Sequence, residues 1–281
     1  MVHPKKHLGQ HFLRDENIAR KIVSYLNPEI PLVLEVGPGM GVLSKYILDL
    51  MEEAQSFPAI DPWFMEIDRE SVDYLRHTYP QIAGRLIQAD FLSWDTSTFP
   101  PAADPSQKFT VIGNFPYNIS SQILFKALDN RDRIPEVIGM FQKEVAERIA
   151  SPPGNRSYGI ISVLLQAFYD IEYLFTVNET VFYPPPRVKS AVIRLRRNTT
   201  EKLACDEAFF TRVVKTAFNQ RRKTLRNAIR VLTGNITPES VPAPSAWLLH
   251  CLDLRAEQLS VADFVQLASE ISTFAQINVS G

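Results

Sequence analysis

The sequence has few cysteines and no long hydrophobic run. Only two of its 281 residues are cysteines, Cys205 and Cys251, and they form no CxxC or other metal-like spacing. A disulfide framework is therefore not expected, and a reducing compartment fits. No apolar run approaches the roughly 20 residues that a membrane span needs. The first residues, MVHPKKHLGQHF, also lack the apolar core of a secretory signal, so we expect a cytoplasmic protein without a membrane partner.

The net charge of −1 is small, but it hides a strong asymmetry along the chain. Residues 187–230 carry 13 Lys and Arg against 3 acids, whereas residues 49–73 carry 8 acids against one Arg. A basic block on a nearly neutral chain favours a polyanion-binding surface, and nucleic acid is the first candidate. The alternative at this stage is a solvated helix surface.

The first two-thirds of the chain alternates short apolar runs with amphipathic ones. This β–α alternation predicts a mostly parallel, doubly wound sheet. The predicted strands are 32–37, 62–68, 85–90, 109–114 and 136–141, and the predicted helices are 42–51, 69–79, 121–130 and 142–150. Residues 159–177 and 191–197 are expected to complete the layer near its far edge. The pattern gives no prediction for residues 51–62.

The character of the sequence changes after Arg197. Residues 206–218 place apolar side chains on one helical stripe, and residues 221–234 are predicted to continue as helix up to Gly234. A further helix is predicted to start at a capping-box-like Ser260 with Asp263. We therefore expect two domains, residues 1–197 and an all-helical domain of residues 198–281.

Polar or glycine residues stand at the ends of four successive predicted strands. In order along the chain they are the glycine loop EVGPGMG with Gly37 and Gly39, then Glu66, Asp90 and Asn114. Ligands of an open parallel sheet bind beyond the carboxyl ends of its strands. Each of these features alone is weak, but together they predict a nucleotide-like cofactor site.

The chemistry of the loop narrows the choice of cofactor. The spacing is GxGxG, which is neither the GxGxxG of dinucleotide enzymes nor a phosphate-gripping P-loop. Glu35, Glu66 and Asp90 would together repel a pyrophosphate and suit a positively charged ligand. S-adenosylmethionine carries a sulfonium and an ammonium but no phosphate, so it is favoured over NAD. Glu66 is expected to accept the ribose hydroxyls, and Asp90 the adenine amino group.

The segment NFPY, residues 114–117, stands at the end of the fourth strand, and its function has two possible interpretations. Proline beside an aromatic residue at a strand end could be turn chemistry. It could also form a substrate pocket, in which Asn114 Oδ1 and the Pro116 carbonyl accept from an adenine amine and Tyr117 offers a stacking face. Methyl transfer to such an amine needs no nucleophilic side chain and no metal, and no triad or metal constellation is present.

The sequence resembles the ribosomal RNA adenine N6,N6-dimethyltransferases, the kasugamycin-sensitivity methylase family of bacteria. The resemblance covers nearly the whole chain and is carried by LGQHFL (8–13), EVGPGMGVLS (35–44), MEID (65–68), QADF (88–91), GNFPYNIS (113–120), QKEVAERI (142–149), FYPPPRVKSAV (182–192) and FNQRRKTLRN (218–227). It implies a class I, Rossmann-like, S-adenosylmethionine-dependent methyltransferase fold with a small C-terminal helical domain. It also implies dimethylation of two adjacent adenosines in a hairpin loop near the 3′ end of 16S rRNA in the small ribosomal subunit. We expect the enzyme to be a monomer.

The resemblance also implies roles for individual residues. It gives cofactor contacts to His11, Leu13, Gly37, Glu66, Asp90 and Asn114, and target-adenine contacts to Asn114, Pro116, Tyr117 and Phe182. The glycine loop adds Gly39 to the expected cofactor contacts, and the basic segment QRRKTLR predicts RNA contacts by Arg221, Arg222 and Lys223. Two positions depart from the family pattern. His11 stands where Asn is usual, which favours a backbone contact there, and Phe115 replaces the usual Leu and is expected to pack away from the site.

Three alternatives remain open from the sequence. The nearest is the sister family that methylates large-subunit rRNA and confers macrolide resistance. A second is a non-catalytic RNA-binding assembly factor on the same fold, although the intact Glu66, Asp90 and Asn-x-Pro-Tyr set argues against lost activity. The third, an NAD enzyme, is disfavoured by the spacing of the glycine loop.

Overall fold

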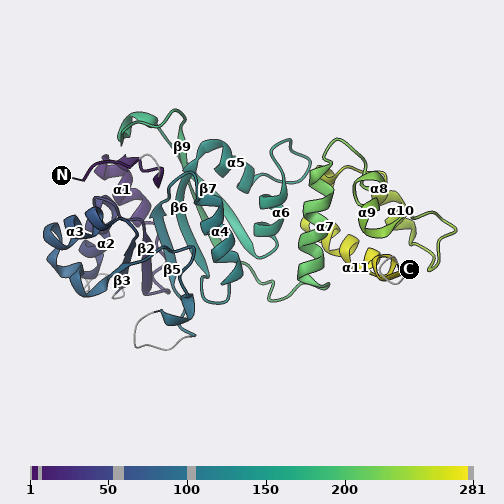
Figure 1. Cartoon of the computed structure of the whole chain (residues 1–281), viewed down its shortest axis with the longest axis horizontal. Coiled ribbons are helices and arrows are strands. Elements are labelled where there is room, and N and C mark those ends of the chain that lie inside the picture. Colours follow the sequence, from purple (N-terminus) through teal and green to yellow (C-terminus); the bar gives the residue numbers. More distant parts are fainter. Residues whose placement is uncertain (1, 6–7, 53–59, 100–105, 278–281) are drawn as a thin grey trace. The chain divides into compact units, whose positions relative to one another are not determined.

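The computed structural model describes residues 2–5, 8–52, 60–99 and 106–277, and its course is drawn in Figure 1. By packing, the chain divides into two compact units. The first comprises Met1–Ala146 and Asp170–Arg197, and the second comprises Glu147–Tyr169 and Asn198–Gly281. A boundary near residue 198 was predicted, but residues 147–169, which the prediction placed in the first domain, pack with the second unit.

The first unit is built on a seven-stranded sheet with the order β4-β3-β2-β5-β6-β9-β7. Its strands are β2 (Leu32–Val36), β3 (Asp61–Glu66), β4 (Leu86–Gln88), β5 (Thr110–Asn114), β6 (Glu136–Gln142), β7 (Tyr169–Val177) and β9 (Ser190–Arg197). The pairs β2–β3, β3–β4, β2–β5 and β5–β6 are parallel, and β6–β9 is antiparallel. The strand order reverses between β2 and β5, which is the switch point where such sheets bind ligands.

The helices of this unit are α1 (Glu16–Val23), α2 (Val42–Glu52), α3 (Arg69–Thr78), α4 (Ser120–Asp129) and α5 (Lys143–Ala150), whose last turn belongs to the second unit. Of these, α2, α3 and α4 connect parallel strands, as the alternation in the sequence predicts. The five predicted strands and four predicted helices are confirmed to within three residues at each end. Of the segment 51–62, α2 extends to Glu52 and β3 starts at Asp61, while residues 53–59 lie outside the described part.

Helix α1 was not predicted, and it follows a short strand that holds the N-terminal segment. Its cap is Asp15, whose carboxylate accepts from the backbone N–H groups of Asn17 and Ile18. Just before it, β1 (Phe12–Leu13) pairs antiparallel with β8 (Phe182–Tyr183). This two-residue ribbon ties the N-terminal segment to a region about 170 positions further along the chain.

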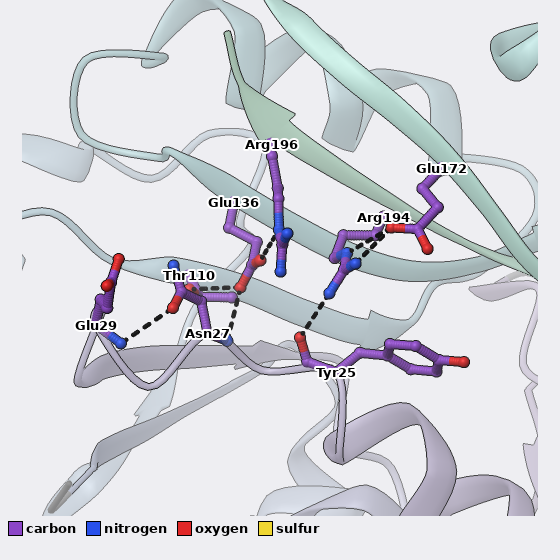
Figure 2. A network of polar contacts seen from close by, with 8 residues as sticks. All are labelled: Tyr25, Asn27, Glu29, Thr110, Glu136, Glu172, Arg194 and Arg196. Carbon is purple, nitrogen blue, oxygen red and sulfur yellow. Dashed lines mark hydrogen bonds and ion pairs between the residues drawn. The ribbon is translucent and has the colours of Figure 1, made fainter.

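A buried carboxylate joins the amino ends of two strands to the loop before β2 (Figure 2). Glu136, which is 1% exposed, accepts from the Asn27 backbone N–H at 3.1 Å, from Thr110 Oγ1 at 3.4 Å and from Arg196 Nε at 3.2 Å. Arg194 beside it donates to the carbonyl of Tyr25 at 3.4 Å. A buried charge needs such donors, because removing them leaves it without compensation. The network fixes the edge of the sheet opposite to the strand ends where ligands bind.

The second unit contains only helices among its described residues, apart from the first residue of β7. Besides the end of α5, its helices are α6 (Ile160–Gln166), α7 (Glu207–Asn219), α8 (Leu225–Ala228), α9 (Arg230–Thr233), α10 (Ala246–Leu252) and α11 (Val261–Ile277). The apolar stripe of α7 is buried as predicted at Phe210, Val213, Val214, Ala217 and Phe218, with Phe209 half-buried. The Tyr158 ring packs edge-on against Phe218, with 6.2 Å between the centroids, which helps to explain why residues 147–169 belong here.

Two local predictions for this unit had different outcomes. The capping box is confirmed, because Ser260 Oγ accepts from the Asp263 N–H at 3.1 Å and the Asp263 carboxylate accepts from the Ser260 N–H at 2.9 Å. The continuous helix over 221–234 is wrong, since residues 220–223 form a turn and two short helices follow. The end at Gly234, which has a φ of 70°, is as predicted. No helix in the described part of the chain has the length and apolar character required to cross a membrane.

The Phe115 ring is buried in the core below the strand ends. It is 1% exposed and packs edge-on against Phe141, with 5.5 Å between the centroids. A Cβ placed on Gly113 or Gly139 would overlap the same ring. The two glycines therefore make the space that the larger aromatic residue occupies, and Phe115 packs inward as expected.

This packing yields a stability prediction. Gly139→Ala should lower the free energy of unfolding by about 1–3 kcal/mol, because the new methyl group forces Phe115 away from its position. Gly84→Ala is the matched control, since a Cβ there has no protein atom within 4 Å and its φ is not positive. Urea denaturation of both variants measures the effect. Equal stability of the two variants would show that the Phe115 pocket tolerates the extra volume.

Candidate functional site

A pocket of about 300 Å³ lies at the carboxyl ends of β2, β3, β4 and β5. It is lined by residues 8–13, 35–40, 42–43, 65–67, 89–92 and 114–119. Nine predicted site residues therefore line one cavity, namely His11, Leu13, Gly37, Gly39, Glu66, Asp90, Asn114, Pro116 and Tyr117. The pocket lies wholly within the first unit.

The glycine loop and the end of β3 are joined through Glu66. Its Oε2 accepts from the Gly39 N–H at 3.0 Å, and its Oε1 accepts from the Asp68 N–H at 2.9 Å. Gly37 and Gly39 have φ angles of 72° and 58°, which glycine adopts without the penalty that other residues incur. A Cβ at Gly37 would meet no protein atom within 4 Å, so the space beside that residue is open to a ligand.

Glu35 is buried deeper, at the end of β2, and its charge state differs from our expectation. Burial raises the pKa of Glu35 to about 8, against the opposing effect of the hydrogen bond from Ser44 Oγ at 2.6 Å, and the charge of Glu66 raises it further. The group is therefore largely protonated at pH 7. We expected three carboxylate charges at the loop, and this expectation is wrong for Glu35. The residue is only 2% exposed, which the sequence pattern could not show.

Glu66 is also buried, at 3% exposure, but it has better donors. The pKa of Glu66 is raised overall, because burial is the largest effect, although the backbone N–H groups of Asp68 and Gly39 act in the opposite direction by favouring the charged form. A carboxylate has about four acceptor positions on its two oxygens, so Glu66 retains acceptor capacity beyond these backbone donors. The next strand end supplies Asp90, whose Oδ1 accepts from the Leu92 N–H at 2.9 Å.

The carboxamide of Asn114 is oriented by the N-terminal segment. Its Nδ2 donates to the backbone carbonyl of His11 at 2.8 Å. A carbonyl oxygen can only accept a hydrogen bond, so the atom of Asn114 that faces it must be the amide nitrogen. The amide oxygen Oδ1 is thereby left as an acceptor for a ligand. The backbone contact that we expect between His11 and the cofactor stays a prediction, and the His11 carbonyl accepts from Asn114.

The His11 side chain bridges two further segments. Its Nδ1 lies 2.8 Å from the carbonyl oxygen of Pro184 and therefore carries the proton of that hydrogen bond. Its ring stacks on Tyr117, with 5.4 Å between the centroids and 30° between the planes. At the beginning of the described segment, Lys5 forms an ion pair with Asp68. Residues 8–13, which line the pocket, are thus held by the contacts of His11 with Pro184 and Tyr117.

Tyr117 and Pro116 have structural partners as well as positions in the pocket. The Tyr117 hydroxyl lies 2.5 Å from Oγ of the fully buried Ser190 at the start of β9. The Pro116 carbonyl accepts from the Ile119 N–H at 3.2 Å, which closes a turn before α4. The turn reading of NFPY is therefore correct for the backbone, and it does not exclude the pocket reading, because a carbonyl oxygen has a second lone pair.

Residues 1–271 of the chain match the family described as Ribosomal RNA adenine dimethylase. The chain belongs to this family. It is 52% identical over 268 residues to Ribosomal RNA small subunit methyltransferase A of Parabacteroides distasonis, covering 95% of this chain and 93% of that protein. It is 53% identical over 273 residues to the protein of the same name from Cytophaga hutchinsonii, covering 96% and 98% of the two chains.

Two solved structures share the fold. A dimethyladenosine transferase from Plasmodium falciparum matches with a TM-score of 0.72 and 24% identity, covering 94% of this chain and 98% of the other. The 23S rRNA methyltransferase ErmE matches with a TM-score of 0.58 and 23% identity, covering 93% and 99%. The expected Rossmann-like, class I methyltransferase fold, followed by C-terminal helices, is thereby confirmed for this member of the adenine dimethylase family.

Two sets of predicted residues do not line the pocket. Phe182 is 3% exposed and belongs to the hydrophobic core of the first unit, next to Leu13 in the ribbon. Arg221 and its two neighbours belong to the second unit, and Arg221 is engaged there by Glu257 Oε2 at 2.6 Å and by the carbonyl of Arg156. Arg222 and Lys223 are exposed.

Sequence reasoning missed Ile67, the residue after Glu66. Ile67 lines the pocket and is 51% exposed, which is unusual for a large aliphatic side chain. The segment MEID could have predicted this exposure, because an apolar residue that stands between two acids just after a buried strand lies outside the hydrophobic core. An exposed apolar side chain in a pocket offers a contact surface for a flat ligand.

The protonated Glu35 leads to a pH prediction. Its pKa is 4.5 ordinarily and about 8 in the folded protein, so the native state holds a proton that the unfolded state has lost between these values. The free energy of unfolding should therefore fall as pH rises through this window, by up to about 1.4 kcal/mol per pH unit, and level off above it. Glu35→Gln mimics the protonated form and should lack this slope. Chemical denaturation of both proteins from pH 5 to 9 measures it, and parallel profiles would contradict the protonated state.

Proposed function

We propose that this protein uses S-adenosylmethionine to dimethylate N6 of two adjacent adenosines of 16S rRNA in the small ribosomal subunit. Curated relatives that cover almost the whole chain are named as small subunit methyltransferases, and the resemblance of the sequence motifs implies the paired adenosines near the 3′ end. The observation that carries the proposal is that NFPY lines the same pocket as the glycine loop, Glu66 and Asp90. A monomeric and cytoplasmic enzyme remains a prediction.

The residues of the pocket fit the cofactor. The open space beside Gly37 admits a ligand next to the backbone, and Glu66 retains acceptor capacity for ribose hydroxyls. Asp90 Oδ2 has no hydrogen-bond partner among the described residues and suits the amino group of adenine. Ile67 supplies an apolar contact for the adenine ring. When bound, the cofactor supplies an electrophilic methyl group on a positively charged sulfur.

The preference of the pocket for a positively charged ligand does not depend on the three carboxylate charges that we expected from the sequence. Glu66 and Asp90 supply the acidic groups, whereas Glu35 carries a proton in the ligand-free protein. A positive ligand nearby favours the ionised form of a carboxyl group and would lower the pKa of Glu35. Cofactor binding is therefore expected to be accompanied by release of a proton near neutral pH.

The chain activates the target amine by accepting hydrogen bonds. The nitrogen of an adenine amine is a poor nucleophile, because its lone pair is delocalised into the ring. Asn114 Oδ1, with its amide held by the His11 carbonyl, and the second lone pair of the Pro116 carbonyl are suitable acceptors for the two N–H groups. Acceptors fixed before the reaction favour the pyramidal nitrogen of the transition state at no further cost in reorganisation.

The target base needs a stacking surface. Tyr117, held by Ser190 and His11, provides an aromatic face, and base–aromatic stacking contributes roughly 1–3 kcal/mol per base. Phe182 lies in the core and pairs with Leu13 in the ribbon, and its contact with the base stays a prediction. RNA contacts away from the pocket are assigned to Arg222 and Lys223, while Arg221 is assigned to its ion pair with Glu257.

Asn114→Ala distinguishes the substrate-pocket function of NFPY from its turn function. Turnover should fall about 100- to 1000-fold, because one preorganised transition-state hydrogen bond is worth roughly 2.7–4 kcal/mol. The measurement is the single-turnover rate of methyl transfer to undermethylated 30S subunits at saturating cofactor, with unmodified and monomethylated adenosine. RNA binding and the unfolding midpoint are the controls for folding. A folded variant with normal rates on both substrates would leave NFPY as a turn only, and methylation of 50S instead of 30S precursors by the wild type would favour the sister activity.

A second comparison separates RNA contacts from structure in the second unit. The Arg222→Ala/Lys223→Ala variant should bind 30S subunits more weakly and with a smaller salt dependence, because fewer counterions are released. Arg221→Ala should instead lower the unfolding midpoint, since it leaves the partly buried Glu257 without its partner. Cofactor affinity should be unchanged in the double variant. If it retains the salt dependence of the wild type, these two cations form only a solvated surface.

A further inference from the structure

The β1–β8 ribbon presents a different kind of surface on each side. Phe12 pairs with Tyr183 and Leu13 with Phe182, and the Arg14 N–H extends the pairing to the carbonyl of Val181 at 2.8 Å. Phe12, Leu13 and Phe182 are buried, and the first two line the pocket. Arg14 and Tyr183 are exposed. The ribbon thus connects the wall of the pocket with a polar and aromatic outer surface.

Arg14 and Tyr183 form a cation–π pair on that outer surface. The guanidinium carbon lies 4.2 Å from the centroid of the ring, and Tyr183 is 49% exposed. The neighbouring acids have other partners, because Asp15 caps α1 and Glu16 accepts from Lys45 and Tyr46. No ion pair engages Arg14 within the described residues. Its positive charge therefore stays available to a ligand beside the aromatic ring.

The loop that follows β8 adds charge of the same sign. Arg187 and Lys189 are exposed, and Val188 between them is 46% exposed. The sequence contains no Asp or Glu from residue 180 to residue 200. We use the term rim for Arg14, Tyr183, Arg187, Val188 and Lys189. In the β1–β8 ribbon and the loop that follows it, the rim comprises three cations, an exposed aromatic ring and an exposed aliphatic side chain.

The residue that follows Tyr183 in the rim contacts the wall of the pocket. His11 donates through Nδ1 to the carbonyl of Pro184, next to Tyr183, and the same ring stacks on Tyr117 in the pocket. A base that enters the pocket brings the phosphates and bases on either side of it to the pocket's surroundings. A surface of stacked aromatic and guanidinium groups with nearby cations is the chemistry that binds single-stranded nucleic acid.

We propose that the rim is a second RNA contact of this protein, which holds the nucleotides next to the adenosine in the pocket. A neighbouring base stacks on Tyr183 and Arg14, and Arg187 and Lys189 contact backbone phosphates. This inference rests on the proposed function for the identity of the RNA. It assigns to the first unit a part of substrate binding that does not depend on the basic turn at Arg222 and Lys223.

The test uses single and paired substitutions in the full-length protein. Tyr183→Leu and Arg14→Gln should raise the dissociation constant for undermethylated 30S subunits, and the KM for them, roughly 5- to 150-fold for the lost stacking. Tyr183→Phe keeps the ring and should behave as the wild type. Arg187→Gln/Lys189→Gln should reduce the slope of log affinity against log salt by about 0.7 per cation. The dissociation constant for S-adenosylmethionine should not change in any of them.

The matched control is another cation–π pair, that of Lys21 and Phe175, where the ammonium lies 4.0 Å from the ring centroid and neither residue lines the pocket. Lys21→Gln and Phe175→Leu should leave 30S affinity unchanged. The inference is overturned if the rim variants bind 30S with wild-type affinity and salt slope, or if the control variants weaken binding equally. Binding is measured separately from methylation, so the two proposals can fail independently. A wild type that binds 30S subunits without methylating them would contradict the proposed function, and the affinities of the rim variants would still test the rim as an RNA contact.

Discussion

Parallel strands end at the same edge of a sheet, and this constraint places the chemical groups of the pocket. β2, β3, β4 and β5 deliver the glycine loop, Glu66, Asp90 and Asn114 to one cavity, although these residues are spread over 78 positions of the sequence. Glu66 then joins two of the loops through the N–H groups of Gly39 and Asp68. The opposite edge of the sheet has its own buried acid, Glu136. Its hydrogen-bond donors come from the loop before β2 and from the strands β5 and β9 (Figure 2).

The strand-end rule explains why much of this arrangement could be predicted from sequence. Apolar runs mark buried strands, and the residue that follows each run is at the ligand-binding edge whatever the loops do next. Glu66 and Asn114 were placed correctly on this basis alone. Phe115 also followed the expectation, because a ring at the end of a central strand has a core to enter and two glycines make room for it.

The features that sequence reasoning missed depend on contacts between distant positions. Whether Glu35 is charged is decided by its burial and by Ser44, and the residue pattern contains neither quantity. Arg221 looked equivalent to Arg222, but only Arg221 meets Glu257, 36 positions later in the chain. The turn at 220–223 interrupts a sequence with good helix formers, which tertiary packing overrides. Such outcomes require the coordinates of both partners.

The N-terminal segment has a temporal consequence for the reaction. Residues 8–13 line the pocket, and His11 holds Asn114 in its accepting orientation, so the enclosing wall is also a part of the acceptor. Two methyl groups on one nitrogen consume two cofactor molecules, and the spent one has to leave between the two transfers. Because the His11 carbonyl orients the Asn114 amide, this single contact has to be in place twice, once for each of the two transfers.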